Sequence, residues 1–393
     1  MNEPYVSIIV PVYNVQAYIT QCLDSLIHQT LREIEIICVD DCGTDDSMKI
    51  VRAYETADSR IRVLTHEQNR GLAAARNTGM QAVKAPYIMF CDSDDFYAPS
   101  MCEKMLEAMK SGGEVDMAMC GTRIVYECSE EMARSDEKYY AIKFNGMQAV
   151  SENILKQCDV SAWNKIYKRE LIERHHIAFP EGLKYEDAYF FNVYAVYARC
   201  IYFLQEPLHR YRRRTGSIMH ATFNRKTEGA IDHFKVALLL WDYYKEHSLM
   251  PMWREYMQKL WVGYLDFSRQ YAASEAELNK LRGMVHDFLS AEQMEMLHFE
   301  MVEAAYTLSK ERDIEKRYCC GLLRLKSNFK KDTLYFLGIP VHKIKYKPTS
   351  IVSSLFGIPY KRSRYVWPNG MKNPDSTVPF ETLLSQSKSG SEV

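Results

Sequence analysis

The first 120 residues alternate between short apolar runs and longer stretches in which apolar residues recur every three or four positions. The apolar runs predict strands buried on both faces, and they cover Val6–Val10, Ile34–Val39, Ile61–Leu64, Tyr87–Cys91 and Asp116–Cys120. The periodic stretches predict helices in between, beginning near Tyr18, Met48 and Gly71. Such an alternation indicates an α/β domain with a doubly wound, mostly parallel sheet.

Polar residues follow these strands at their carboxyl ends. The segment Pro11–Asn14 is expected to break the first strand into a loop. Ligands of doubly wound sheets bind outside the carboxyl ends of the strands. The polar residues at or just beyond those ends, and therefore in the predicted site, are Asn14, Asp40, Asp41, Asp92 and Asp94.

Three carboxylates, those of Asp92, Asp94 and Asp95, stand within four residues after the fourth strand. They repel one another unless a positive charge lies among them, and a hard divalent cation that also carries phosphate oxygens would supply one. The alternative is a solvated acidic turn that caps the next helix. No glycine-rich phosphate loop follows any strand, which disfavours a Rossmann dinucleotide site and a P-loop.

The pattern changes after Gly121. Residues from Gly121 to Gly146 are charged and weakly periodic, as in a linker or surface segment. A second block from Asp159 to Ser217 includes the strand-like run Ile201–Leu204. Beyond it, Ile231–Tyr244 and Met257–Tyr271 predict aromatic-rich amphipathic helices. We therefore divide the chain at 1–122, 123–217, 218–325 and 326–393.

The overall composition is that of an ordinary soluble protein, with 47% apolar and 26% charged residues among 393. Neither a basic leader followed by an apolar run nor a long uncharged apolar segment is visible, so no signal peptide or membrane span is expected. The 11 cysteines form no CxxC pair. Their scatter through strands and helices suggests small core residues in a reducing compartment.

The net charge of −1 hides a basic tail. Between Lys316 and Lys372 there are thirteen Lys or Arg against the single acid Asp332. The tail also contains an imperfect repeat, Tyr335–Pro340 and Ser354–Pro359, with basic residues after each copy. Two interpretations stay open, an interfacial anchor on an anionic membrane and an arm that packs on the protein.

Taken together, the motifs resemble the inverting family 2 glycosyltransferases of the GT-A fold, especially bacterial enzymes that build capsule, exopolysaccharide or lipopolysaccharide. The resemblance covers roughly residues 5 to 217, and its main segments are Ser7–Asn14, Val39–Ser47, Asn69–Asn77 and Phe90–Asp95. Cys42 and Asp46 stand where the family usually has Gly. We expect a differently shaped turn there and no lost ligand contact.

The resemblance implies a donor half at 1–122 that binds a UDP-sugar. Pro11, Tyr13 and Asn14 would line the nucleotide pocket, with Tyr13 against the base. Asp41 or its neighbour Asp40 would accept a hydrogen bond from uracil. Further donor contacts would come from Arg76, from Asp92 at the ribose or sugar, and from Arg210 and Arg212 at the diphosphate.

The metal implied by the resemblance is Mg²⁺ or Mn²⁺, held by Asp94 with Asp92. Asp187 would be the catalytic base that deprotonates the acceptor hydroxyl, at the start of a helix where Asp is otherwise a common cap. In the acceptor half at 123–217, Trp163 would stack on a sugar, and Glu186 would orient Asp187 or contact the acceptor. Asn164 and Lys165 would shape the groove.

The expected partners are a UDP-sugar, a glycan or lipid-linked glycan acceptor and, through the tail, an anionic membrane surface, with no nucleic acid. The expected location is the cytoplasm or the inner face of the cell membrane. Two alternatives remain. A sugar-1-phosphate nucleotidyltransferase would ordinarily show a Gly-rich loop and a Lys after the first strand, where Pro11–Asn14 stands here. An inactive nucleotide-binding scaffold protein is the other.

Overall fold

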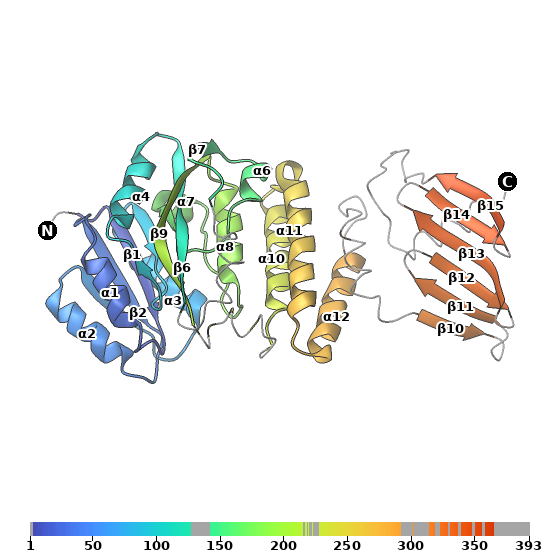
Figure 1. Ribbon diagram of the computed structural model, residues 1–393, viewed down its shortest axis with the longest axis horizontal. Coiled ribbons are helices and arrows are strands. Elements are labelled where there is room, and N and C mark those ends of the chain that lie inside the picture. The colour runs from blue at the N-terminus through green and yellow to red at the C-terminus, as the bar shows by residue number, and fades with distance from the viewer. Residues whose placement is uncertain are drawn as a thin grey trace. The chain divides into compact units, whose positions relative to one another are not determined.

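The computed structural model describes residues 3–126, 142–214 and 228–291, the single residues 217, 219, 222 and 301, and six strands between 314 and 364. The chain forms two compact units, whose helices and strands are labelled in Figure 1. The first consists of Met1–Thr227 with Leu238–Ser248, and the second of Glu228–Ala237 with Leu249–Val393.

The first unit is built on a nine-stranded sheet with the order β3-β2-β1-β4-β8-β6-β9-β5, in which β7 also pairs with β9. The strands β1 to β4 are parallel, and β8 runs antiparallel to both β4 and β6, so that β6 and β9 point the same way as the first four. This is the mostly parallel sheet that the sequence predicts. Its strands are β1 (Val6–Val12), β2 (Ile34–Asp40), β3 (Ile61–Thr65), β4 (Tyr87–Phe90), β5 (Phe96–Tyr97), β6 (Val115–Tyr126), β7 (Gly146–Ala149), β8 (Lys165–Lys168) and β9 (Cys200–Arg213).

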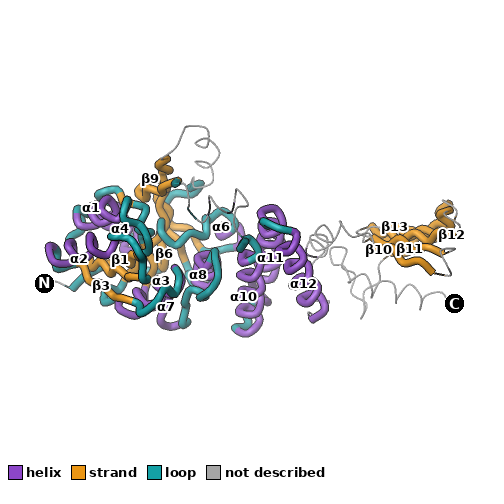
Figure 2. Tube along the Cα trace, turned by 90° about the horizontal axis from the view of Figure 1, so that it is seen from below, coloured by secondary structure: helices purple, strands orange, loops and turns teal. Residues whose placement is uncertain are grey.

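Helices lie on both sides of this sheet (Figure 2). Alternate β1 residues, including Ile8 and Val10, pack in one core with α1, α2 and α4. On the other side Ile37 and Val39 pack against Ala75 of α3. The helices of this unit are α1 (Ile19–Ile27), α2 (Ser47–Ala57), α3 (Leu72–Ala82), α4 (Met101–Lys110), α6 (Glu152–Leu155), α7 (Arg169–Arg174), α8 (Glu186–Ala195) and part of α10 (Asp232–Glu246).

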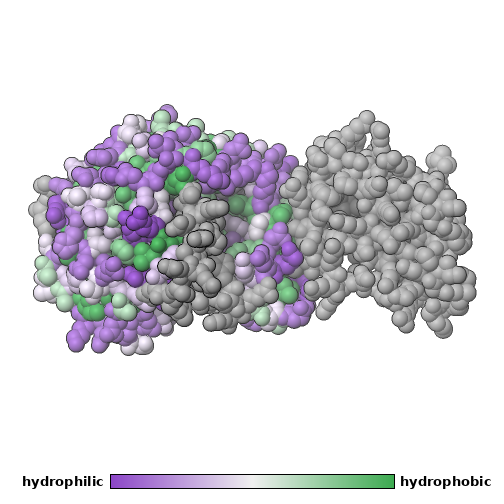
Figure 3. Space-filling view, viewed as in Figure 1, coloured by the Kyte–Doolittle hydropathy of each residue, from purple (hydrophilic) through white to green (hydrophobic). Residues whose placement is uncertain are grey.

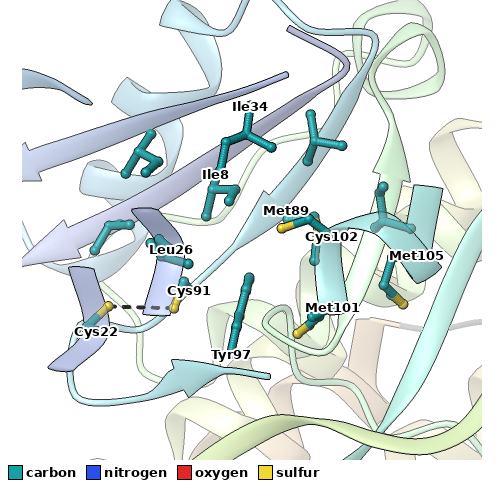
Figure 4. Packing of buried hydrophobic residues seen from close by; sticks show 14 of the residues in the cluster. Ile8, Cys22, Leu26, Ile34, Met89, Cys91, Tyr97, Met101, Cys102 and Met105 are labelled. Carbon is teal, nitrogen blue, oxygen red and sulfur yellow. Dashed lines mark hydrogen bonds between the residues drawn. The ribbon is translucent and has the colours of Figure 1, made fainter. Parts of the chain in front are cut away.

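Cysteine and methionine side chains fill much of the core beneath the fourth strand (Figure 4). The Sγ atoms of Cys22 and Cys91 lie 3.7 Å apart, and both residues are free thiols without exposed surface. Cys38 and Cys120 are buried free thiols as well. Core positions are what the sequence predicts for these four cysteines.

Two strands extend beyond their predicted ends. β1 continues through Pro11, which pairs with Val39, to Val12. Proline is tolerated there because the pairing of β1 with β4 ends at Ile9, so no neighbour on that side needs a donor. β6 continues to Tyr126 because it pairs with β9 along its length, so the expected linker does not begin at Gly121. Residues 127–141 of that expected linker lie outside the described residues.

The second unit contains helical and strand segments. Its helices are α11 (Met250–Tyr271), α12 (Glu275–Ala291) and the first residues of α10. The Phe234 ring packs edge-on against Trp261 at 5.0 Å, and Glu277 accepts a hydrogen bond from the Gly229 amide. No helix in the described part of the chain is both long enough and apolar enough to cross a bilayer.

The tail forms an antiparallel sheet of six strands in sequence order. Both copies of the imperfect repeat lie where one strand ends and the next begins, at β12–β13 and β14–β15, and each hairpin has a register shift near its turn. The repeat is therefore a repeated hairpin. The strands are β10 (Ile314–Tyr318), β11 (Leu323–Asn328), β12 (Lys331–Phe336), β13 (Ile339–Lys347), β14 (Ser350–Leu355) and β15 (Ile358–Arg364).

Candidate active site

Asp41, just beyond β2, organises the loop that leads into α3. Its Oδ1 lies 2.8 Å from Nδ1 of His66 and accepts from the Arg70 amide, and its Oδ2 accepts from the Gly71 amide. Only 3% of Asp41 is exposed. A carboxylate has about four acceptor positions, and the contacts of Asp41 with His66 and with two loop amides fix this loop.

The turns after β1 and β2 are joined by side-chain hydrogen bonds. Asn14 has a positive φ of 51°, and its Oδ1 accepts from the Thr44 amide at 2.7 Å. Asp40 is half-buried and accepts from the Cys42 amide. Cys42 has a φ of 57°, in the left-handed region that glycine enters without strain. The turn thus has the left-handed backbone conformation that is typical of glycine, although the residue there is a cysteine.

Tyr13 is one of the few large hydrophobic side chains exposed in the described part of the chain. Its exposed fraction is 48%. Most of the described surface in view in Figure 3 is hydrophilic. Tyr13 follows Val12, the last residue of β1, and Pro11 is buried beside Val39 of β2. An open aromatic ring at the carboxyl end of a central strand is suited to stacking on a base.

The carboxylates after β4 have three different environments. Asp92 is half-buried and accepts a hydrogen bond from Nη2 of Arg76 at 2.6 Å. Asp94 is half-buried and accepts from Nε of Arg214 at 2.7 Å. Asp95 is buried and accepts from the Arg212 amide. Burial and the charge of Asp92 raise the pKa of Asp94, although Arg214 acts to lower it.

The arginines at the end of β9 and just beyond it have different partners. Arg212 donates from Nε to the Asp94 carbonyl and from Nη2 to Gln21, so it holds the backbone of the acidic turn. Arg210 donates to the Pro207 carbonyl and stands opposite Arg123 in the register. Burial and the charge of Arg123 lower the pKa of Arg210. Arg214, in contrast, donates directly to a carboxylate of the acidic turn.

Arg76 connects the acidic turn after β4 to the start of α8. It is 2% exposed, and Nη1 donates to Glu186 at 2.6 Å while Nη2 donates to Asp92. Its guanidinium also lies 5.2 Å from the centre of the Phe179 ring. Burial acts to lower the pKa of Arg76, but Asp92 and Glu186 outweigh it and raise that pKa. Arg76 is therefore a charged bridge inside the domain.

Asp187 occupies the first turn of α8. Tyr185, just before the helix, has a left-handed φ of 64°, and such strain in a non-glycine residue is common at functional sites. Asp187 accepts from the Ala188 amide through Oδ1 and is half-buried. Burial and the charge of Glu186 raise the pKa of Asp187 to about 7, against the opposing effect of Arg76. A base with that pKa is suited to accepting a proton near neutral pH.

The two expected acceptor residues are enclosed by protein contacts. Trp163 is 5% exposed, and its ring stacks on His209 at 4.2 Å and on Tyr211 at 5.3 Å. Glu186 is 5% exposed and bonded to Arg76. These are the contacts of a core aromatic and of a buried, ion-paired carboxylate. Lys165, with no exposed surface, bonds Asn164 and Asp159 inside the same half.

The metal prediction can be tested on the donor atoms present. Within the described ranges, no group of three or more His, Cys, Asp or Glu side chains is arranged to hold a metal ion. Asp92 and Asp94 nevertheless offer oxygen ligands at a half-buried strand end, and each of them already faces a cationic group. Mg²⁺ is often held by one or two carboxylates together with substrate phosphates. The residues therefore fit a divalent cation that arrives with a diphosphate.

Two polar residues in this region are absent from the site predicted from the sequence. His66 lies between Asp41 and Thr78, and it follows β3 as Asp41 follows β2, a position that could have identified it. Arg214 is two residues beyond Arg212, and the period of two along a strand could have placed both on one face. Their carboxylate partners lie 25 and 120 residues away in the chain.

Comparison with known proteins assigns this chain to a family. The family model described as Glycosyl transferase family 2 matches residues 7–175. Glycosyltransferase GlyG of Streptococcus pneumoniae serotype 4 is 31% identical over 56% of this chain and 74% of its own length. The EpsH protein of Bacillus subtilis is 36% identical over 56% of this chain and 64% of its own length. The match thus spans less than two thirds of EpsH.

A solved structure shares the fold. TarS residues 1–349 of S. aureus, in complex with UDP-GlcNAc, align with a TM-score of 0.61 and 20% identity, over 84% of this chain and 96% of that one. The expected GT-A architecture with a helical region after it is confirmed.

Proposed function

Because this chain belongs to glycosyl transferase family 2, we propose that it transfers a sugar, with inversion, from a UDP-sugar to a hydroxyl of a growing glycan in surface-polysaccharide synthesis. One observation carries the proposal. Arg76 bonds Asp92, just after β4, and Glu186, beside Asp187, which supports a single site that includes the predicted donor and base residues. The complex of TarS with UDP-GlcNAc supports a UDP-sugar as the donor class.

The nucleotide would lie across the ends of β1 and β2. Tyr13 offers an exposed ring for the base, and Asp41 or Asp40 offers an acceptor for uracil N3–H. Pro11 and Asn14 shape this edge. The diphosphate would extend toward the end of β4, where Arg214 and Arg212 already surround the acidic turn and Arg210 is near in sequence.

Asp94, assisted by Asp92, would hold Mg²⁺ or Mn²⁺. The bound cation supplies Lewis-acid stabilisation of the negative charge on the departing diphosphate. The chain's own contribution is to orient both carboxylates, through the contact of Arg76 with Asp92 and the contact of Arg214 with Asp94.

The transfer step uses Asp187 as the base. The acceptor oxygen forms a bond to the anomeric carbon while the bond from that carbon to the UDP oxygen breaks. The acceptor proton passes to Oδ2 of Asp187, because Oδ1 accepts from the Ala188 amide. One carboxylate is sufficient, since the leaving group is already a good one.

A screen of UDP-sugars and other nucleotide sugars for metal-dependent nucleotide release tests the proposal. We expect UDP release that requires Mg²⁺ or Mn²⁺ and is lost in Asp94→Ala. Asp24→Ala is the matched control, because Asp24 is exposed on α1 and bonds Tyr54. Undiminished turnover in chelator, or in Asp94→Ala, would contradict the proposal.

Two alternative functions were considered, a nucleotidyltransferase and an inactive scaffold protein. Family membership favours glycosyl transfer over a sugar-1-phosphate nucleotidyltransferase. An inactive scaffold protein would bind UDP and metal in calorimetry without releasing UDP from any donor. The raised pKa of Asp187, to about 7, favours an active base.

The basic tail suggests where the acceptor is located. Thirteen basic residues between 316 and 372 suit an anionic membrane surface, and a lipid-linked acceptor would be found there, on the cytoplasmic side. Co-sedimentation with anionic liposomes should weaken with salt and disappear when residues 316–393 are deleted. Binding that survives the deletion would remove this role from the tail.

A further inference from the structure

Arg76 and Glu186 are charged groups that the proposed reaction does not use directly. Both are almost fully buried, at 2% and 5% exposure. Breaking a buried ion pair by removing one partner usually costs much stability, whereas replacing the whole pair by apolar residues often does not. A charged bridge in such a place therefore needs a reason beyond stability.

The geometry points to Arg76 and Glu186 as positioning residues that connect the donor-side carboxylate Asp92 to the base Asp187. One guanidinium donates 2.6 Å hydrogen bonds in two directions, to Asp92 after β4 and to Glu186 at the start of α8. Asp92 and Glu186 are 94 positions apart in the chain, and both bond the same guanidinium. This inference rests on the proposed function and gives it a fixed geometry.

The planar guanidinium is required for this role. Two diverging N–H groups reach two carboxylates at once, whereas a lysine ammonium is a point charge on a flexible stem. The Phe179 ring beside the guanidinium restricts it further. Asn77 bonds both the amide and the carbonyl of Phe179, so α3 also fixes the position of that ring.

Glu186 would act only through Arg76. Its Oε1 accepts from Arg76, while its neighbour Asp187 uses Oδ1 on the Ala188 amide. Rotation of Glu186 away from Arg76 would loosen the first turn of α8 and displace Asp187. Direct contact of Glu186 with an acceptor would instead require it to leave this bond.

Kinetics of Arg76→Met, Glu186→Gln and the double variant test the inference in the full chain. We expect each single variant to lower kcat by roughly tenfold to a hundredfold, and the double variant to be no worse than Arg76→Met. Glu186→Gln should leave the UDP dissociation constant unchanged within twofold, and Arg76→Lys should not restore kcat. The control is Glu170→Gln, because Glu170 pairs with Arg174 on α7 and both side chains are exposed.

Two results would overturn the inference. One is a double variant whose loss in kcat equals the product of the single losses, since independent effects multiply. The other is a raised acceptor KM in Glu186→Gln with normal kcat, which would indicate acceptor contact.

A second measurement separates this inference from the proposed function. With Arg76 present, the change in unfolding free energy in the Asp92→Asn/Glu186→Gln double variant should differ from the sum of the changes in the two single variants. In the Arg76→Met background, the double variant should show the sum of the two single changes. This cycle needs no donor. If UDP does not bind but the free-energy changes are non-additive as expected, the proposed function is rejected and the inference about Arg76 stands. If the changes are additive while Arg76 is present, the inference about Arg76 is rejected.

Discussion

The Nε atom of Arg214 donates to Oδ2 of Asp94 at 2.7 Å, so the proposed metal ligand is already paired with a cation. Both side chains are 21% exposed. A divalent cation that binds Asp94 must displace this guanidinium or share the carboxylate with it. Arg214 therefore opposes metal binding in the absence of a diphosphate.

Arg214→Gln should tighten the binding of Mn²⁺ alone. We expect roughly a fivefold gain, because unit charges about 4 Å apart interact by about 1 kcal/mol in water. Titration of Mn²⁺ followed by electron paramagnetic resonance measures it. Asp94→Asn should abolish the gain when combined with Arg214→Gln. Unchanged or weaker Mn²⁺ binding in Arg214→Gln would show that Asp94 does not ligate the metal.

Tyr13→Ala should weaken UDP binding by about tenfold, because base stacking on an aromatic ring contributes about 1 to 3 kcal/mol. Tyr13→Phe should bind as wild type does. Tyr5 provides the matched control, since it is 44% exposed against 48% for Tyr13 and precedes β1 at the opposite end. Calorimetry with UDP compares the three variants. Equal effects of Tyr5→Ala and Tyr13→Ala would exclude the stacking role.

The strands of the parallel half could be predicted because they are apolar runs bounded by turn residues. Their carboxyl ends share one edge of the sheet, and this rule assigns Asp41 and Asp92 to one site on sequence position alone. The errors in the prediction were local. Pro11 was predicted to end β1, but the strand continues through it. The pairing of β1 with β4 has already ended at Ile9, so the missing N–H of proline breaks no hydrogen bond there.

Burial of polar groups could not be predicted from the sequence. Arg76 resembles a surface or ligand-binding arginine at the start of a helix, and its enclosure depends on Glu186, 110 residues away. Its residue type suggests that Trp163 stacks on a sugar. The rings of His209 and Tyr211 stack on it instead, so Trp163 belongs to the core. Such partners come from separate elements, so residue type and spacing alone do not identify them.

Gly79→Ala should destabilise the first unit by about 1 to 3 kcal/mol, as overpacking of a close-packed core does. A Cβ at Gly79 would lie 2.4 Å from Cγ2 of Ile9, where α3 crosses β1. Gly263→Ala in α11 is the control, because a Cβ there would meet nothing within 4 Å beyond its own stretch of helix, and alanine favours helix. Urea unfolding compares them. Equal stability of Gly79→Ala and wild type would contradict the close packing of α3 on β1.

Asp187→Asn should lower kcat by about 10² to 10⁴, the usual range for loss of a general base, while UDP still binds. The wild-type rate should fall tenfold per pH unit below about pH 7, because the raised pKa leaves Asp187 protonated there. A pH series of initial rates measures both. Retained transfer in Asp187→Asn, or a rate independent of pH between 5 and 8, would remove Asp187 from the role.

The same raised pKa predicts that Asp187→Asn gains stability relative to wild type as the pH rises. The folded protein holds the Asp187 proton up to about pH 7, and the unfolded chain releases it near 3.8. Wild type therefore loses stability progressively between those values, by up to about 4 kcal/mol at 1.36 kcal/mol per unit. Asparagine does not titrate. The difference in unfolding free energy between the two proteins should grow from pH 4 to pH 8 in urea titrations, and a constant difference would show that Asp187 ionises in the folded state as easily as in the unfolded one.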